Sequence, residues 1–259
     1  DEKTVDEIVK KVFLILSNCI VFYETYKGEA TYENSAEEVA KSSSNILDKW
    51  VIALFHKMLG DGTGALDAYD TFRSARAIRD FCNDFSTWYI RRSRDRFKSD
   101  DVEDRNNALA TTQYILTEFS KYLAPFAPFF AEEMYLKVTE GMSMESVHLE
   151  DWPKGESVSE ELERENILTK MENIRKLVTL GLEARQRAGI KVRQPLAKIT
   201  ITNHEFDSQY LDLLKDEINV KEVLFDKSLP EDGAVLDTEI TAQLKEEGIV
   251  REFTRSIQD

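Results

Sequence analysis

The sequence contains little cysteine, proline or glycine, with 2, 5 and 10 of these residues among 259. So few cysteines exclude a disulfide scaffold, and so little proline and glycine exclude collagen and low-complexity disorder. Long hydrophobic runs are absent too: the longest, Val12–Phe22, has 11 residues and includes Ser17 and Asn18. A membrane-spanning helix needs about 18 or more consecutive apolar residues, so the sequence excludes one.

Nothing at the start of the sequence resembles a secretory signal. Residues 1–7 are mostly acidic, and no small-residue cleavage site follows the first apolar run, whereas a signal peptide begins with a basic region. We therefore expect a cytoplasmic protein with no membrane partner.

Metal and redox chemistry have little support in the sequence. Cys19 and Cys82 lie far apart within apolar surroundings, which favours buried reduced thiols over a bridge or a metal pair. His56, His148 and His204 are scattered singly, without the spacing of zinc ligands. We expect no metal and no cofactor in this chain.

The charge of the chain is strongly negative overall and locally positive. With 34 Lys and Arg against 49 Asp and Glu, the formal net charge is −15, which argues against a nucleic-acid partner. However, eight basic and three acidic residues lie between Arg73 and Lys98, and five basic and no acidic residues lie between Arg185 and Lys198. Two basic islands in an acidic chain can still form a positive face.

Helical periodicity dominates roughly the first 140 residues. Apolar residues at spacings of three and four predict amphipathic helices over 5–26, from Asn45 onward, from Asp70 or Thr71 to Tyr89, from about Asp104 to Ala124, and over 129–138. We predict that residues 29–44 are a long connection and that Gly60–Gly64 interrupt the second helix, because glycine costs about 1 kcal/mol per helical position. The pattern predicts a helical bundle.

The second part of the chain predicts a mixed structure. A long helix over 162–188, ended by Gly189, precedes a strand over 198–202, a helix over 206–218, a strand over 220–225 and a last helix from Asp237. The chain lacks an initial Met and the last helix lacks a stop signal, so we expect a fragment of a longer protein. The prediction is a mainly α protein with a helical-bundle domain over 1–143, a linker over 144–154 and a small, truncated α/β domain over 155–259.

The run from Trp88 to Lys98 is the first candidate site. On a helix it would place Arg91, Arg94 and Lys98 along one face and Arg92 and Arg96 along an adjacent one, matching the spacing of phosphates. Trp88 or Tyr89 offers a plane for an unpaired base. Four arginines in six positions cannot all reach a buried partner, so we predict phosphate contacts rather than core ion pairs. A solvated helix end is the alternative. The candidate RNA-binding residues here are Trp88, Arg91, Arg92, Arg94, Arg96 and Lys98.

The second candidate site follows the long helix. After Gly189 we predict an extended segment in which Lys191 and Arg193 point to the same side and Val192 points into the core. These cations either contact a phosphate backbone or protect a strand edge from aggregation. The candidate RNA-binding residues here are Arg185, Lys191 and Arg193.

Several segments together carry a family resemblance. The sequences Trp-Tyr-Ile-Arg-Arg-Ser-Arg-Asp-Arg-Phe at 88–97, Leu-Ala-Pro-Phe-Ala-Pro-Phe at 123–129 and Ser-Val-His-Leu-Glu-Asp-Trp-Pro at 146–153 resemble the anticodon-binding region of isoleucyl-tRNA synthetases. Segments 189–196, 236–239 and 245–253 are similar to those that follow it in that family. The bundle is shared with the valyl, leucyl and methionyl enzymes, whereas the arginine run followed by Ile-Lys-Val-Arg-Gln-Pro-Leu resembles the isoleucyl branch.

The sequence also departs from that family. The family usually has Asn at the position of Thr87, often Arg at that of Asp95, and usually Trp at that of Lys98. Its second helix is usually unbroken where this chain has Gly60–Gly64. The ATP-handling signatures of the family, His-x-Gly-His and Lys-Met-Ser-Lys-Ser, are missing from the sequence.

The resemblance implies a module that binds the anticodon stem and loop of isoleucine-accepting tRNA. In the longer parent, a catalytic core absent here would join isoleucine to this tRNA with ATP and Mg²⁺, so the fragment alone is expected to be an inactive monomer. The alternatives are a helical protein-interaction module with solvated basic runs, or the corresponding part of a valyl or leucyl enzyme.

Overall fold

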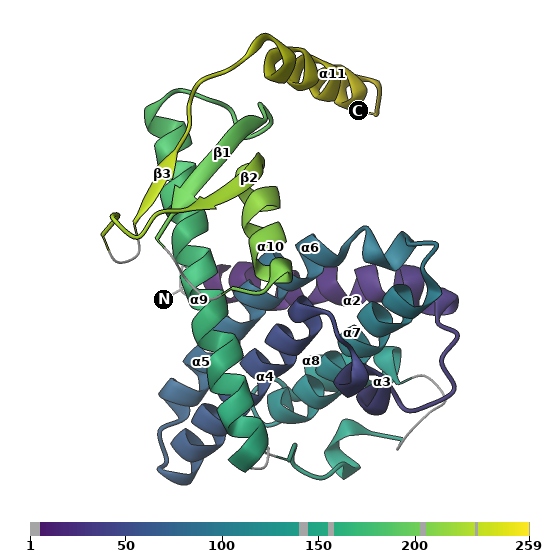
Figure 1. Cartoon of the computed structure of the whole chain (residues 1–259). Helices are drawn as coiled ribbons and strands as arrows, with labels where there is room; N and C mark the ends of the chain where they lie inside the picture. The colour runs from purple at the N-terminus through teal and green to yellow at the C-terminus, as the bar shows by residue number, and fades with distance from the viewer. Residues whose placement is uncertain (1–5, 140–144, 155–157, 203–205, 231–232, 259) are drawn as a thin grey trace. The chain divides into compact units, whose positions relative to one another are not determined.

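The computed structural model describes residues 6–139, 145–154, 158–202, 206–230 and 233–258, apart from the side chains of 158–163, 252 and 255–258. Helices dominate, and one three-stranded sheet lies in the C-terminal part (Figure 1). The chain divides into two compact units, Asp1–Ile167 and Leu168–Asp259. The mainly α fold with a small α/β part is confirmed, while the functional domain limits proposed above stay a prediction.

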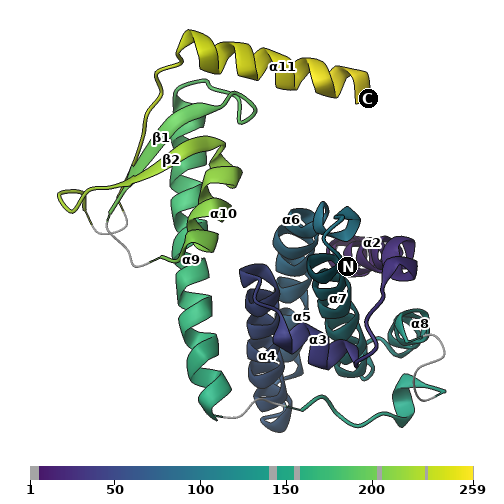
Figure 2. The ribbon, with the colours of Figure 1, turned by 45° about the vertical axis from the view of Figure 1, so that its right-hand side comes forward.

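The first unit is a bundle of helices (Figure 2). In chain order its elements are η1 (Val9–Phe13), α2 (Leu14–Tyr26), η2 (Lys27–Glu29), α3 (Ala36–Ser42), α4 (Ile46–Asp67), α5 (Thr71–Asp84), η3 (Phe85–Ile90), α6 (Arg91–Ser93), η4 (Arg96–Lys98), α7 (Val102–Leu123), α8 (Pro128–Val138) and η5 (Val147–Leu149). The segments η1 and η3 are π-helical, and the other η segments are 3₁₀ turns. Helix α9 (Val158–Arg187) begins in this unit and continues into the second.

Side-chain caps fix where the helices begin. Asn45 accepts a hydrogen bond from the Leu47 amide at 2.9 Å, which confirms it as the N-cap of α4, and Asp70 caps α5 in the same manner. Helix α3 contradicts the predicted connection over 29–44. The helix begins at a capping box, in which the Ser35 and Glu38 side chains each accept a hydrogen bond from the other's backbone amide at 3.2 Å.

The predicted break at Gly60–Gly64 is wrong, because α4 continues to Asp67. Gly62 is buried at the contact between α4 and α7, where any Cβ would collide with the Tyr122 hydroxyl. That hydroxyl lies 2.5 Å from Ser74 Oγ on α5. Close packing of three helices around Gly62 therefore outweighs its poor helix propensity.

The core of the bundle is aromatic. Phe81 stacks on Phe85 with ring centroids 5.7 Å apart, Phe85 stacks on Tyr89 at the same distance, and Phe81 meets Phe119 edge-on at 5.1 Å. These four side chains are at most 3% exposed. The core thus ties α5 and η3 to α7 and fixes the start of the basic run.

The two cysteines are free and buried, as predicted. Burial raises the pKa of the Cys19 thiol to about 12 and also raises the pKa of Cys82. Both thiols are therefore protonated and packed as small apolar groups at neutral pH.

The second unit combines α9 with a small sheet. Strands β1 (Leu196–Ile201) and β2 (Val220–Phe225) pair in parallel and are connected by α10 (Ser208–Ile218), which confirms the predicted strand-helix-strand unit. An additional strand, β3 (Ala234–Leu236), pairs antiparallel with β1, giving the order β2-β1-β3. The last helix, α11 (Ala242–Gln258), begins later than predicted.

Candidate nucleic-acid interface

The first basic run is folded as a helix end followed by a turn. The π-helix η3 leads into α6, which ends at Ser93, and a 3₁₀ turn over Arg96–Lys98 follows. The predicted single helix with arginines along two faces is therefore wrong beyond Ser93. The side chains of the run consequently point in several directions, and each has its own surroundings.

Arg96 lies inside the bundle, with 11% of its side chain exposed. Its two terminal nitrogens donate to the two carboxylate oxygens of Asp48, both at 2.7 Å, and its Nε donates to Asp104 at 2.8 Å. Asp48 has no exposed surface. The prediction that the arginines of this run avoid core ion pairs is therefore wrong for Arg96, because two acids from α4 and α7 reach it.

Two hydroxyls complete this buried network. Ser43 Oγ donates to Asp48 at 2.6 Å and Tyr89 Oη donates to it at 2.9 Å. Burial and the nearby Asp48 charge raise the pKa of Tyr89, so it stays a neutral donor. Burial alone would lower the pKa of Arg96, but its hydrogen bonds with Asp48 and the Asp48 charge raise it above the ordinary value. The network fastens η3 and η4 to α4 and α7.

The rest of the run lies toward solvent. Arg91, Arg94 and Lys98 are exposed, whereas Arg92 and Trp88 are half-buried. Arg91 Nε donates to the Thr87 carbonyl at 2.7 Å, Lys98 Nζ lies 5.7 Å from the Tyr26 ring centroid, and Trp88 meets Trp50 edge-on at 6.4 Å. Neither Arg94 nor Lys98 forms an ion pair with a described residue. Arg94 and Lys98 are therefore the exposed cations of the run that lack both an ion pair and a backbone acceptor among the described residues.

The second basic run begins at a helix stop, as predicted. Gly189 adopts φ +67°, the Gly189 amide donates to the Gln186 carbonyl, and the Ile190 amide donates to the Arg185 carbonyl. This pattern is a Schellman motif.

The next four residues form a turn instead of the predicted extended segment. The Gln194 amide donates to the Lys191 carbonyl at 3.0 Å, and β1 begins only at Leu196. Val192 is 46% exposed, so its predicted core position is wrong. Lys191 and Arg193 are both exposed, but on a turn their separation by two residues no longer places them on one side.

Arg185 holds that turn from inside. It is 1% exposed and donates to four carbonyl oxygens: those of Lys191 and Gln194 in the turn, at 3.1 and 2.9 Å, and those of Ile218 and Asn219 at the end of α10, at 2.7 and 2.8 Å. Burial lowers its pKa to about 10, so the guanidinium stays charged at neutral pH. The prediction that Arg185 contacts RNA is therefore corrected: it positions the turn that carries Lys191 and Arg193.

A shallow groove of about 790 Å³ adjoins this turn. Arg193, Lys215, Lys221 and Arg251 line it together with Asp212 and Asp216. Most of these cations are already paired, since Lys215 binds Asp212 at 2.6 Å and both Lys221 and Arg251 bind Glu247 at 2.6 and 2.7 Å. Arg193 is therefore the main unpaired charge of the groove among the described residues.

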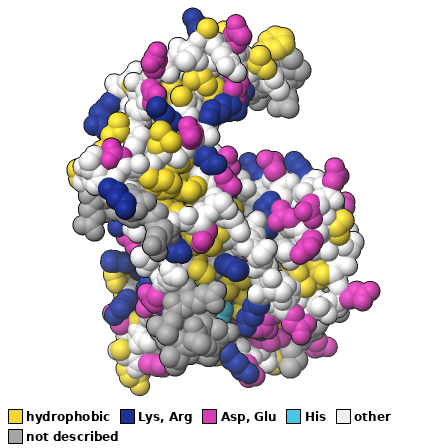
Figure 3. Space-filling model, in the orientation of Figure 1, with side chains coloured by type: hydrophobic (Ala, Val, Ile, Leu, Met, Phe, Trp, Pro, Cys, Tyr) yellow, Lys and Arg dark blue, Asp and Glu magenta, His cyan; other side chains and the backbone are white. Residues whose placement is uncertain are grey.

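The surface carries mixed charge. In Figure 3, Lys and Arg side chains lie between Asp and Glu side chains over the visible face of each unit and do not form one continuous basic field. Within the described ranges, no three His, Cys, Asp or Glu side chains are grouped as metal ligands, and no helix has the length and apolarity needed to cross a membrane.

Comparison with known proteins shows which family this chain resembles. The model of the anticodon-binding domain of tRNA ligase matches residues 48–201, which include both basic runs. The chain is also similar to isoleucine–tRNA ligases: 35% identical over 87% of this chain for Clostridium tetani, 36% over 89% for Chlamydia trachomatis and 33% over 99% for Streptomyces coelicolor.

These relatives are much longer than the chain, which spans 22% of the first two and 24% of the third. The segment matched by the family model, in contrast, covers more than half of the chain. It runs from the first turn of α4 to the end of β1 and includes the buried Asp48–Arg96 pair. The chain therefore belongs to the anticodon-binding domain family of tRNA ligases.

Proposed function

We propose that this chain binds the anticodon stem and loop of isoleucine-accepting tRNA as part of an isoleucine–tRNA ligase. The observation that carries the proposal is the family match over 48–201 together with the cations that lie outward within it. The similarity to isoleucine–tRNA ligases supports a tRNA that accepts isoleucine.

The geometry supports contact with the phosphate backbone. Arg94 and Lys98 are exposed, without carboxylate partners in the described part of the chain, and lie on either side of Arg96, whose buried ion pairs hold their backbone in one shape. Preorganised cations bind phosphates without first losing conformational freedom. Such contacts position an RNA, whereas base contacts specify it.

The test is a salt titration of tRNA binding by the full chain. With isoleucine-accepting tRNA, the logarithm of the association constant should fall linearly with the logarithm of the salt concentration. Changing Arg94→Gln and Lys98→Gln together should lower the slope by about two units, one for each phosphate contact. A lack of RNA binding would favour the protein-interaction alternative.

A matched control removes two cations that already have partners. Lys10 binds Asp6 at 2.6 Å and Lys137 binds Glu133 at 2.7 Å, so Lys10→Gln with Lys137→Gln changes the net charge equally but should leave the slope unchanged. Competition with valine- and leucine-accepting tRNA tests the choice of tRNA: equal competition would refute the isoleucine assignment.

The catalytic part of the proposal concerns the longer parent. ATP and Mg²⁺ would act in a catalytic core outside this chain, and the chain alone would be a cytoplasmic monomer without aminoacylation activity. A preparation shown free of host enzyme should give no charging of tRNA above a buffer blank, and light scattering should give the monomer mass.

A further inference from the structure

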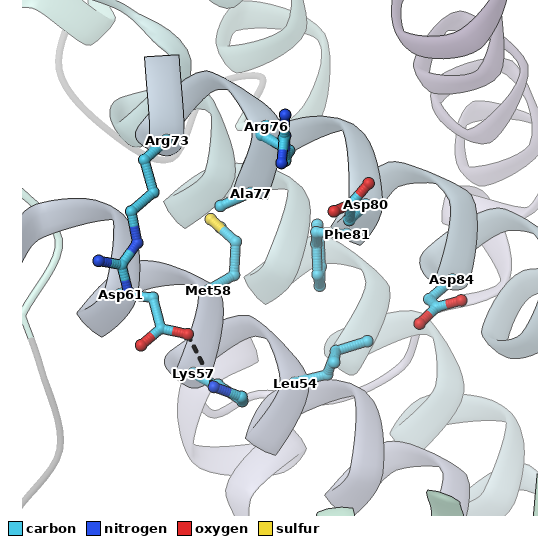
Figure 4. A pocket seen from close by; sticks show the side chains of 10 residues that line it. All are labelled: Leu54, Lys57, Met58, Asp61, Arg73, Arg76, Ala77, Asp80, Phe81 and Asp84. Carbon is cyan, nitrogen blue, oxygen red and sulfur yellow. Dashed lines mark hydrogen bonds and ion pairs between the residues drawn. The ribbon is translucent and has the colours of Figure 1, made fainter. Parts of the chain in front are cut away.

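A groove between α4 and α5 lies outside both candidate RNA-binding sites, although Arg73 and Arg76 of the first basic island line it. It has a volume of about 320 Å³ and an apolar floor of Leu54, Met58, Ala77 and Phe81, whose side chains converge in Figure 4. Charged side chains surround this floor: Lys57, Asp61, Arg73, Arg76, Asp80 and Asp84. A concave apolar surface with a few charged groups around it is typical of a small-ligand site.

One end of the groove carries Arg73 and Arg76, with Asp61 beside the Arg73 guanidinium in Figure 4. Arg73 and Arg76 lie in the first turns of α5, are exposed, and form no ion pair with the described residues. The Arg76 guanidinium carbon lies 4.9 Å from the centroid of the Phe72 ring, which is 70% exposed. By contrast, Lys57 already binds Asp61 at 2.7 Å. Two guanidinium groups at the edge of an apolar groove, neither in an ion pair with a described residue, favour an anionic ligand with an apolar part.

The other end of the groove carries carboxylates. Asp80 and the half-buried Asp84 lie further along α5, with Asp84 at the far end from Arg73 in Figure 4. An ionised carboxylate only accepts hydrogen bonds. Cytosine and adenine present an exocyclic amino donor, whereas uracil presents a carbonyl oxygen at the equivalent position. This end therefore favours amino-bearing bases and disfavours uracil.

We propose that the α4–α5 groove binds an unpaired, amino-bearing nucleotide of RNA, an inference that rests on the function proposed above. The phosphate binds Arg73 and Arg76, the base lies on the apolar floor, and its amino group donates to Asp80 or Asp84. The exposed face of α5 continues toward the basic run, since Thr87 Oγ1 donates to the Asn83 carbonyl at 2.8 Å and Arg91 Nε donates to that of Thr87. At a rise of 1.5 Å per residue, about 22 Å of helix separates Arg76 from Arg91, and an RNA bound at Arg91 would have to span this distance to reach the groove.

The experiment measures fluorescence anisotropy of labelled octanucleotides of cytidine, adenosine and uridine with the full chain. We expect the cytidine and adenosine probes to bind about fivefold or more tightly than the uridine probe. Arg73→Gln with Arg76→Gln should weaken cytidine binding about tenfold at 0.1 M salt and reduce the salt slope by about 1.4, the value for two single-strand phosphate contacts.

Two further variants separate the groove from general charge. Ala77→Leu fills the floor without changing charge and should weaken cytidine binding about fivefold with an unchanged slope. Lys137→Gln is the control, because Lys137 does not line the groove and already binds Glu133 at 2.7 Å. Its binding should match that of the unmodified chain.

The outcomes distinguish this inference from the function on which it rests. If tRNA binding responds to Arg94→Gln with Lys98→Gln but oligonucleotide binding is unaffected by the Arg73, Arg76 and Ala77 variants, the groove proposal is overturned and the proposed function stands. Equal affinity for the three octanucleotides would also overturn it. If the unmodified chain binds neither tRNA nor oligonucleotides, the proposed function itself fails.

Discussion

The buried pair of Arg96 and Asp48 leads to the sharpest prediction of stability. Changing Arg96→Met removes two hydrogen bonds of 2.7 Å to Asp48 and one of 2.8 Å to Asp104. Among the described residues, Asp48 would then keep only the Ser43 and Tyr89 hydroxyls as side-chain donors, in a position without solvent exposure. Leaving one charge of a buried pair uncompensated costs about 3–5 kcal/mol of unfolding free energy.

The reverse change should cost less. In Asp48→Asn, Arg96 keeps its contact with Asp104, whose side chain is 32% exposed, so the remaining charge is still partnered. We expect a loss of about 2–3 kcal/mol, the value of hydrogen bonds to a charged group. Arg94→Met is the matched control, because Arg94 is exposed two positions away. It should change stability by less than about 0.5 kcal/mol.

Tryptophan fluorescence during urea unfolding is the suitable assay. The chain has three Trp residues, at positions 50, 88 and 152, and all belong to the first unit. RNA binding should respond differently from stability: Arg94→Met should reduce the salt slope of RNA binding without lowering the unfolding free energy. A loss below about 1 kcal/mol for Arg96→Met, or an equal loss for Arg94→Met, would refute the assignment of Arg96 as the residue that holds the run in place.

Three further predictions test packing, the turn and the buried thiols. In the same urea assay, Gly62→Ala should destabilise the first unit by about 2–4 kcal/mol, because the new Cβ would displace the Tyr122 hydroxyl. Gly60→Ala should instead stabilise this unit by up to about 1 kcal/mol, because the space around its Cβ is open. Val192→Asp should change the stability of the second unit by less than about 0.5 kcal/mol by circular dichroism, and cooperative loss of the fold would contradict the exposed turn. Because the folded-state pKa of Cys19 is raised from 9.0 to about 12, the unfolded chain loses this proton first. The contribution of this thiol to the unfolding free energy should therefore be constant below about pH 8 and fall as pH rises toward 12, and an unfolding free energy that stays flat between pH 8 and 11 would contradict this.

Local features of the fold could be predicted because their causes are local in sequence. Asn45 and Asp70 cap their helices through amides two or three residues away, and Gly189 ends α9 through its own backbone angle. The capping box that starts α3 was equally visible as Ser35 with Glu38 three residues later. The signal for α3 is therefore local, and the predicted connection over 29–44 does not account for it.

The helix through Gly62 could not be predicted from local propensity. Its stability depends on Tyr122 on α7 and Ser74 on α5, which become neighbours only in the folded bundle. Glycine is unfavourable in a helix by itself, but here the missing side chain allows close packing. A tertiary contact therefore reversed the prediction.

The same limit applies to the candidate site. Arg94 and Arg96 are indistinguishable in a charge pattern, yet Arg96 binds Asp48, which is 48 positions away in sequence, and Arg94 has no such partner in the described chain. Arg185 likewise counts as a basic residue of the second run until its four carbonyl acceptors are known. Burial and partner identity, which sequence spacing does not contain, decide which cations can reach RNA.

This division explains how a chain with a net charge of −15 can bind a polyanion. Carboxylates neutralise a cation only at short range, as Asp48 does for Arg96 and Asp80 does for Arg79, and at about 0.1 M salt the field of more distant surface acids is screened beyond about 10 Å. A phosphate therefore experiences the cations near it that lack an acid partner. On the first unit these include Arg94 in the run and Arg73 beside the α4–α5 groove. If the proposed function holds, local pairing, and not net charge, determines where this surface attracts RNA.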